Sequence, residues 1–240
     1  MSPPAALAIQ VFLLLVLIVI GPPVDLVVTR GLKLRVGPGR KLRYYRIGIA
    51  SQWICAALAF LSPGWRACFF LHPPPTALTA RAAVRIVLWL ILALIFLANF
   101  RPTAKALMTG SIPPNLARYL RRLSFFLPVT RDERRWFAAL CVTAGICEEI
   151  LFRGFLYHAI RVWPLHLGPL AALLLSSVIF GFNHAYQGLG GVVNTGIAGV
   201  LFGLIFLLTG NLALAMLLHA AIDLQVLILL ARMPAEEATQ

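Results

Sequence analysis

Long runs of apolar residues alternate with short polar segments along the chain, and most charged residues fall in the polar segments. Seven runs are long enough to cross about 30 Å of hydrocarbon as helices, since a helix rises about 1.5 Å per residue. They cover residues 5–21, 44–62, 82–100, 136–160, 169–185, 190–208 and 212–231. The pattern predicts an all-α protein, a polytopic bundle of about seven to eight transmembrane helices. The count depends on residues 63–71, which could extend the second run or re-enter the membrane.

Composition excludes a soluble enzyme, because 60% of the 240 residues are hydrophobic, 12% are charged and the mean hydropathy is +0.89. A net charge of +13 could indicate a nucleic-acid partner, but no polar domain gathers the basic residues into a binding surface. Instead, 15 of the 21 Lys and Arg residues lie in two segments, 30–46 and 101–135. Cytoplasmic loops collect such residues, so we predict both segments to be cytoplasmic and expect membrane lipids, not nucleic acid, as partners.

Threading seven helices with both basic segments inside places the N-terminus outside and the tail, residues 232–240, in the cytoplasm. The compact, Arg-rich and Ala/Leu-rich chain favours a prokaryotic inner membrane. Residues 5–21 are interpreted as a retained helix, because Pro22-Pro23 follows them instead of a small-residue cleavage site. Residues 115–127 are too charged to cross and predict an amphipathic interfacial helix. The T-x-x-E spacing of Thr130 and Glu133 predicts the start of the fourth long helix.

Three acidic residues, Glu148, Glu149 and Asp223, lie inside apolar runs. A charge at mid-membrane costs at least about 2.5 to 3.5 kcal/mol, so such residues are functional candidates that face the bundle interior. Glu149 and Arg153 stand four residues apart and can pair on one helix face, whereas Glu148 is rotated away by about 100°. Two adjacent carboxylates cannot both ionise cheaply in low dielectric, which makes Glu148 a candidate general base. The alternative is a structural ion pair between helices.

Two further patterns place histidines inside apolar runs. Phe180 and His184 share a helix face with Asn183 between them, and His219 stands one turn before Asp223. Counted from the cytoplasmic helix ends, Glu148 and His219 both lie at a depth of about 18 Å. By the same count, His184 lies close to the cytoplasmic end of its run. Either that helix is tilted or displaced, or the site opens toward the cytoplasm.

The three patterns, E-E-x-x-x-R, F-x-x-x-H and H-x-x-x-[D/N], follow in this order along the C-terminal helices. In this the chain resembles the CAAX-protease and bacteriocin-processing (CPBP, or Abi) family of intramembrane proteases, which includes type II prenyl-protein endopeptidases. The resemblance implies a four-helix catalytic core around a polar cavity and peptide hydrolysis inside the membrane. The roles that it implies are a base for Glu148, a water-holding group for His184, positioning for Glu149 and Arg153, a place facing the scissile carbonyl for His219 and Asp223, and further positioning for Phe180 and Asn183.

One position departs from the prenyl-endopeptidase branch, which has Asn where this chain has Asp223. An ionised Asp cannot donate a hydrogen bond to an oxyanion, so Asp223 stays protonated, only orients His219, or takes part in a different mechanism. Glu148, His184, His219 and Asp223 could also supply zinc ligands. We favour a metal-free site without a cofactor, because the resemblance implies glutamate chemistry and no H-E-x-x-H is present.

We therefore expect N-terminal helices over residues 1–135, a protease core over 136–231 and a tail over 232–240. The leading hypothesis is an intramembrane endopeptidase that cleaves a membrane-anchored or prenylated (CAAX-type) peptide by glutamate-activated water. A non-enzymatic scaffold or bacteriocin-immunity-type binding protein of the same fold is the alternative. A proton- or ion-coupled transporter is a third reading, but the chain shows no inverted repeat.

Overall fold

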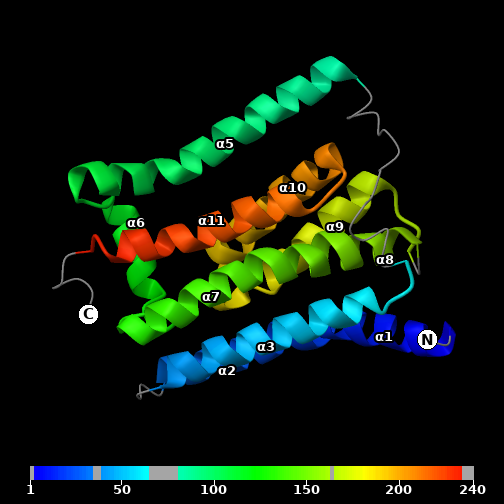
Figure 1. The fold of residues 1–240 in the computed structure, drawn as a ribbon, viewed down its shortest axis with the longest axis horizontal. Helices are drawn as coiled ribbons and strands as arrows, with labels where there is room; N and C mark the ends of the chain where they lie inside the picture. Colours follow the sequence, from blue (N-terminus) through cyan, green and yellow to red (C-terminus); the bar gives the residue numbers. More distant parts are fainter. Residues whose placement is uncertain (1–2, 35–38, 65–80, 163–164, 234–240) are drawn as a thin grey trace.

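The computed structural model describes residues 3–34, 39–64, 81–162 and 165–233, and these residues form helices joined by turns (Figure 1). The α-helices are α1 (Pro3–Leu15), α2 (Gly21–Leu34), α3 (Arg40–Phe60), α5 (Ala82–Thr109), α6 (Pro114–Arg122), α7 (Arg131–Glu148), α8 (Tyr157–Val162), α9 (Pro169–Phe182), α10 (Leu189–Thr209) and α11 (Ala213–Leu230). Two π-helical segments, η1 (Val16–Ile20) and η2 (Glu149–Leu156), and the short 3-10 helix η3 (Ala185–Gln187) complete them. The predicted all-α bundle is confirmed.

Four helices are long and apolar enough to cross a membrane: Pro4–Leu34, Ala82–Thr109, Leu189–Thr209 and Ala213–Leu230. The chain is thus an integral membrane protein, as its hydropathy predicted. Each of the other three predicted runs also forms a helix. Two of them begin with charged turns, at Arg40 and Arg131, and α9 has only 14 residues. Most of the segment 63–71, on which the exact count depends, lies outside the described residues.

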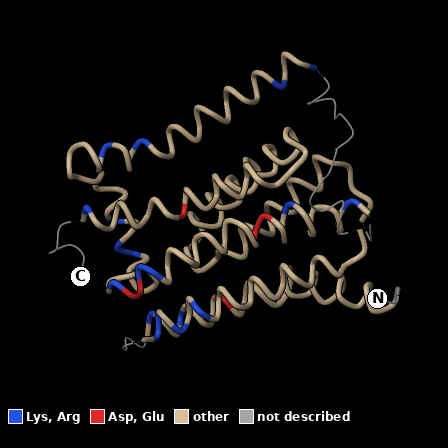
Figure 2. The backbone as a smooth tube through the Cα atoms, viewed as in Figure 1, with Lys and Arg blue, Asp and Glu red and all other residues tan. Residues whose placement is uncertain are grey.

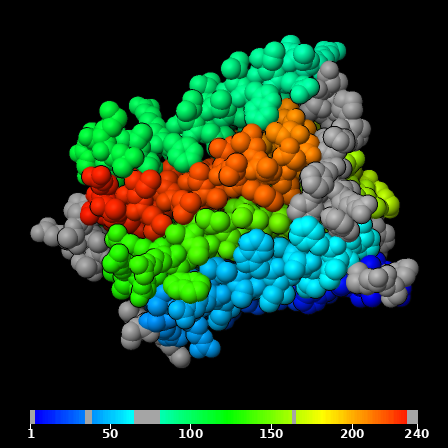
Figure 3. Space-filling view, viewed as in Figure 1, coloured from blue at the N-terminus to red at the C-terminus, as the bar shows by residue number. Residues whose placement is uncertain are grey.

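Helices α3, α7, α11 and α5 lie side by side across one face of the molecule (Figures 1 and 3). Figure 2 shows that the basic ends of α2, α3, α6 and α7 gather at one end of the bundle, as a common cytoplasmic side for the two basic segments requires. Helix α1 begins at one end of the bundle, and α11 ends at the other. This arrangement agrees with an odd number of crossings, while the absolute orientation in the membrane stays a prediction.

The first helix is longer than the prediction for residues 5–21, because it continues through Pro22-Pro23 to Leu34. The π-helical segment η1 precedes the prolines, and within it the Gly21 N–H bonds the Val16 carbonyl, five residues back. In that pattern the next donor to the Leu17 carbonyl would be residue 22, and proline has no N–H. The Asn183 side-chain amide takes its place, donating to Leu17 O at 2.9 Å. Asn183, the residue that follows α9, thus lets the first helix continue past two prolines.

The fourth long helix starts where its sequence predicted. Thr130 accepts a hydrogen bond from the Glu133 N–H, and the Glu133 carboxylate accepts one from the Thr130 N–H, which completes a capping box. The predicted amphipathic helix over 115–127 is also present, as α6, although it ends at Arg122.

Small residues set the spacing of the central helices. A Cβ added at Gly145 would lie 2.6 to 2.8 Å from backbone and Cβ atoms of Ala220, so α7 and α11 touch almost backbone to backbone. A Cβ added at Gly181 would lie 2.6 Å from the Val192 carbonyl oxygen, so α9 and α10 are equally close there. Such contacts are how helices pack in lipid, and here they bring the polar residues of three helices together.

Candidate active site

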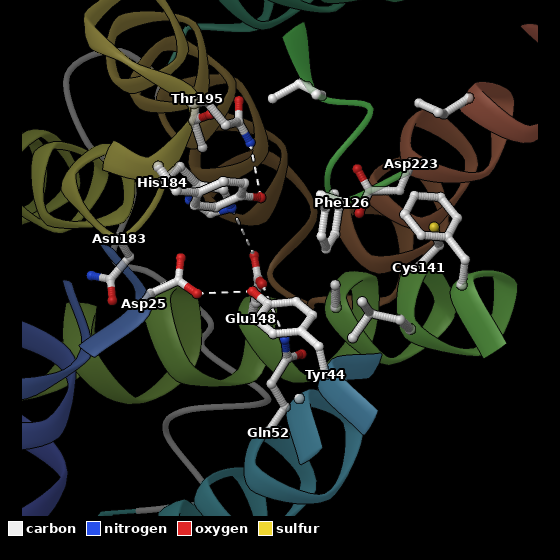
Figure 4. A pocket seen from close by; sticks show the side chains of 18 of the residues that line it. Asp25, Tyr44, Gln52, Phe126, Cys141, Glu148, Asn183, His184, Thr195 and Asp223 are labelled. Atoms are coloured by element: carbon white, nitrogen blue, oxygen red, sulfur yellow. Dashed lines mark hydrogen bonds and ion pairs between the residues drawn. The ribbon is translucent and has the colours of Figure 1, made fainter. Parts of the chain in front are cut away.

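A cavity of about 1060 Å³ lies inside the bundle and receives side chains from both halves of the chain. Glu148 projects into it from α7, His184 from the turn after α9, and His219 and Asp223 from α11. Asp25 of α2 and two residues of α3, Tyr44 and Gln52, also line it (Figure 4). The structure therefore gathers the three sequence patterns at one place, and adds residues that the sequence did not single out.

The two adjacent glutamates face different surroundings. At the point where they stand, the long helix changes from α7 to the π-helical η2, in which every residue is buried. Glu149 is fully buried and its Oε1 accepts two hydrogen bonds, from Arg153 at 2.9 Å and from His219 Nδ1 at 2.8 Å. The predicted pair of Glu149 and Arg153 thus forms, and it also fixes a histidine of another helix.

Arg153 is held among aromatic rings as well as by its carboxylate. Its guanidinium lies 4.2 Å from the ring centre of Phe180 and 5.5 Å from that of Phe202. Gly199 leaves room for this stack, because a Cβ there would lie 3.1 Å from the guanidinium and 3.2 Å from the Phe180 ring. The Phe180 ring thereby contacts both Arg153 and the His184 ring, as a positioning residue would.

Glu148 turns its carboxylate to the cavity and has looser contacts. Its Oε1 accepts a long hydrogen bond, 3.4 Å, from the side-chain amide of Gln52. Its Oε2 lies 3.8 Å from His184 Nε2 and 3.9 Å from His219 Nε2, and has no hydrogen-bond partner among the described residues. Polar atoms at such separations commonly share a bridging water.

His184 lies at the level of Glu148 because its helix stops early. The predicted run 169–185 forms a helix only to Phe182, so His184 lies in the turn that follows and not on the helix. Its Nδ1 lies 2.9 Å from the Phe180 carbonyl, which can only accept a hydrogen bond. Nδ1 therefore carries the proton, and in the neutral ring Nε2 presents a lone pair toward Glu148. The structure thus gives an explanation that the sequence analysis did not consider: the helix ends within the bundle, beside the cavity.

His219 connects the two glutamates to Asp223. Its Nδ1–H donates to Glu149, and its Nε2 lies 3.9 Å from Glu148 Oε2 and 3.7 Å from Asp223 Oδ2. The Phe202 ring stacks on the imidazole, with centroids 4.8 Å apart and planes at 15°. The equal depths that the sequence predicted for Glu148 and His219 are thus confirmed.

Asn183 has a different position from the other candidates. Its side-chain amide donates to the carbonyls of Leu17 and Ile179, each at 2.9 Å, and so joins α9 to η1. It lies next to His184 in the chain and binds the backbone of the first helix. A positioning role for Asn183 stays a prediction, as do the chemical roles of the other site residues.

The sequence analysis missed Phe202 of α10 and three polar residues of the N-terminal helices. Asp25 accepts a hydrogen bond from the Tyr44 hydroxyl at 2.8 Å, and Gln52 donates to Glu148. Asp25 was not considered because the predicted first helix covers residues 5–21 only. An acidic residue within one turn of a long apolar run was the available signal.

Within the described part of the chain, no group of three or more His, Cys, Asp or Glu side chains has the arrangement of a metal site. The zinc alternative concerns the same four residues, Glu148, His184, His219 and Asp223, and a chelator distinguishes it from glutamate chemistry.

Comparison with known proteins identifies the part of the chain that carries this site. Residues 131–225 match the family described as type II CAAX prenyl endopeptidase Rce1-like. No significant match was found among curated proteins or among solved structures. The matched segment contains Glu148, Glu149, His184, His219 and Asp223 but none of the N-terminal helices; the predicted division at residues 135 and 231 stays a prediction. Residues 131–225 thus form a domain of the CAAX protease (CPBP) family.

Proposed function

We propose that this protein is an intramembrane endopeptidase that hydrolyses a peptide bond in a membrane-anchored or prenylated, CAAX-type substrate, with Glu148 as the general base. The family of residues 131–225 supports a CAAX-type peptidase. The observation that carries the glutamate mechanism is the free Glu148 Oε2, 3.8 and 3.9 Å from two imidazole nitrogens. A water placed among these atoms can donate to the carboxylate and to His184 Nε2, which leaves its lone pairs free for attack.

In the proposed reaction, Glu148 takes a proton from that water as the oxygen adds to the scissile carbonyl carbon. The carbonyl oxygen becomes an oxyanion, and a protonated His219 donates its Nε2–H to it. Glu148 then returns the proton to the amide nitrogen as the C–N bond breaks, which releases a carboxylic acid and an amine.

The surrounding groups hold this arrangement in place. Glu149 fixes the His219 ring through Nδ1, and Arg153 balances the charge of Glu149. Asp223, 3.7 Å from His219 Nε2, orients that imidazole. This assigns Asp223 the orienting role among the three that the sequence left open, and it needs no protonated carboxyl.

The experiment compares wild type with Glu148→Gln on membrane-anchored and farnesylated quenched peptides in detergent, each with and without a strong chelator. We expect Glu148→Gln to fold normally and to lose activity by about 10²- to 10⁴-fold, and we expect wild-type activity to survive chelation. Activity retained in the variant would remove Glu148 as the base. Loss on chelation with recovery on adding zinc would make these residues metal ligands, and a folded wild type inactive on every peptide would favour the non-enzymatic scaffold.

A further inference from the structure

The reaction proposed above gives the oxyanion a single hydrogen-bond donor, the Nε2–H of His219. Oxyanion sites commonly combine two donors, because the negative charge of the transition state gathers on one oxygen. The carboxylates of Glu148 and Asp223 lie 3.9 and 3.7 Å from His219 Nε2, but an ionised carboxylate only accepts hydrogen bonds. A second donor has to come from another side chain of the cavity.

Tyr186 lines the cavity from the short helix η3, two residues after His184. Its ring lies beside the His184 ring, with centroids 6.0 Å apart and planes at 33°. On another side it contacts the Phe126 ring, with centroids 5.9 Å apart. Two aromatic contacts thus hold the phenol next to the histidine that is proposed to bind the attacking water.

The Tyr186 hydroxyl has its oxygen occupied and its proton unused. The oxygen accepts a hydrogen bond from Gln187 Nε2 at 3.1 Å. Gln187 is itself fixed, because its Oε1 accepts a hydrogen bond from the Tyr119 hydroxyl of α6 at 3.1 Å and its Cβ packs directly over Gly191 of α10. The phenol proton makes no hydrogen bond to a described residue, so it is available to a ligand in the cavity.

Three carboxylates lie around the Tyr186 hydroxyl. It interacts electrostatically with those of Asp25, Glu148 and Asp223, which stand on different sides of the cavity (Figure 4). Two of them, Glu148 and Asp223, are also the carboxylates next to His219 Nε2. The hydroxyl and that nitrogen therefore serve the same part of the cavity.

A phenol is suited to donate among acidic groups. A tyrosine hydroxyl keeps its proton at neutral pH and carries no charge, so it does not neutralise the proposed base as a lysine or arginine would. It is less suited to hold the attacking water. That water already donates to Glu148 and His184, and a donor on its oxygen would occupy a lone pair needed for attack. The carbonyl oxygen of the substrate is the acceptor that remains.

We propose that the Tyr186 hydroxyl donates a second hydrogen bond to the scissile carbonyl oxygen, alongside His219, which makes Tyr186 a catalytic residue. The inference rests on the proposed peptidase function. Tyr186 keeps its proton throughout, so Glu148 still takes and returns the one proton that is transferred. Gln187 is a positioning residue, since its amide turns the phenol proton toward the cavity.

The test measures cleavage of a farnesylated, quenched peptide by Tyr186→Phe, which keeps the ring and removes only the hydroxyl. Because the hydrogen bond strengthens as charge develops on the carbonyl oxygen, we expect kcat to fall about 10²-fold with KM nearly unchanged. Tyr157→Phe is the matched control, since Tyr157 packs on Phe206 and does not line the cavity. It should behave as wild type.

Two couplings distinguish an oxyanion donor from a tyrosine that only packs on His184. A peptide with C=S in place of the scissile C=O has a weaker acceptor, so the sulfur should cost less activity in Tyr186→Phe than in wild type. Asp223→Asn places an amide N–H beside His219, so Tyr186→Phe should cost less in that background. Gln187→Glu can only accept and should draw the phenol proton to itself, which lowers kcat even if Tyr186→Phe fails to fold.

Three results would overturn the inference while leaving the peptidase in place. The first is an unchanged kcat in Tyr186→Phe. The second is a loss confined to KM or to the melting temperature, which would show that Tyr186 only packs in the wall. The third is a loss that simply multiplies with those of the sulfur and of Asp223→Asn. Wild type that cleaves no peptide would overturn the proposed function and this inference together.

Discussion

The two walls of the cavity are built in different ways. The catalytic wall joins its helices by close backbone contact at Gly145 and by a fully buried ionic cluster around Glu149. In the α2–α3 wall, the side of the cavity that α2 and α3 form, α3 packs along α7 through side chains and adds single hydrogen bonds. These hydrogen bonds run from Trp53 to Thr143 and from Gln52 to Glu148, while Asn183 binds η1 at the start of α2. The comparison teaches that the groups around the proposed reacting atoms are held by buried charge and close backbone contact, whereas the α2–α3 wall is held by side-chain packing and single hydrogen bonds.

Two long helices show the same contrast in their packing. Helices α5 and α10 both qualify as membrane spans, yet 6% of the apolar window of α5 is buried inside the protein against 39% for α10. Lipid solvates apolar side chains as well as a protein core does, so burial in this chain does not follow hydropathy.

The largest effect is expected from breaking the buried ion pair. Arg153→Leu leaves the Glu149 carboxylate uncompensated in the protein interior and should lower the free energy of unfolding by about 3 to 5 kcal/mol. The matched control is Arg135→Leu, which removes an arginine from the exposed pair with Asp132, where the side chains are 67% and 71% accessible. Thermal unfolding in detergent gives the melting temperature of each variant. Equal melting temperatures would show that the buried ion pair does not stabilise the core.

The close contact of α7 and α11 should be the next most sensitive feature. Gly145→Ala places a methyl group 2.6 to 2.8 Å from Ala220 atoms, which forces the helices that carry Glu148 and His219 apart. We expect about 1 to 3 kcal/mol of destabilisation and a fall in kcat of up to about 100-fold. Gly31→Ala in α2, whose Cβ would meet nothing within 4 Å, should be neutral or slightly stabilising. If both alanines behaved alike, the packing contrast between the walls would not hold.

A smaller effect is expected where Asn183 replaces a missing backbone donor. Asn183→Leu leaves the Leu17 carbonyl without its side-chain partner and should cost about 1 to 2 kcal/mol. Pro22→Ala restores an N–H at the position that a π-turn would use, so the double variant should recover part of that loss. The four proteins form a double-mutant cycle of melting temperatures. Strictly additive losses would contradict the explanation given for the long first helix.

The smallest effect should come from the cap at the exposed start of α7. Thr130→Ala removes the acceptor of the Glu133 N–H and should cost about 1 kcal/mol without changing kcat. Thr130→Ser keeps the hydroxyl and provides the control. A marked loss of activity in the alanine variant would mean that the start of α7 is coupled to the site more tightly than the comparison of the walls implies.

The sequence predicted the catalytic wall far better than the opposite one. Charged residues at helical spacing inside apolar runs, such as Glu149 with Arg153, limit the possible arrangements because lipid cannot solvate them. The end of α9 was missed because residues 183–185 are apolar or neutral enough to continue the run. The turn that follows Phe182 satisfies the end of the helix itself, because the His184 N–H bonds the Gly181 carbonyl and its ring bonds the Phe180 carbonyl. Asp25 was missed for the opposite reason: the predicted first helix stopped at residue 21, before Pro22-Pro23, and the donor that allows the helix to continue lies 166 residues from Leu17.

That same separation bears on how the protein is made. The first helix leaves the ribosome long before Asn183, so the Leu17 carbonyl must do without its partner amide while 166 further residues are added. At about 5 to 20 residues per second, this takes roughly 8 to 33 s. A helix that waits in lipid with an unsatisfied carbonyl is at risk of unwinding at its prolines or of failing to insert. Quality control of the nascent chain would therefore act first on the N-terminal helix, well before the catalytic residues exist.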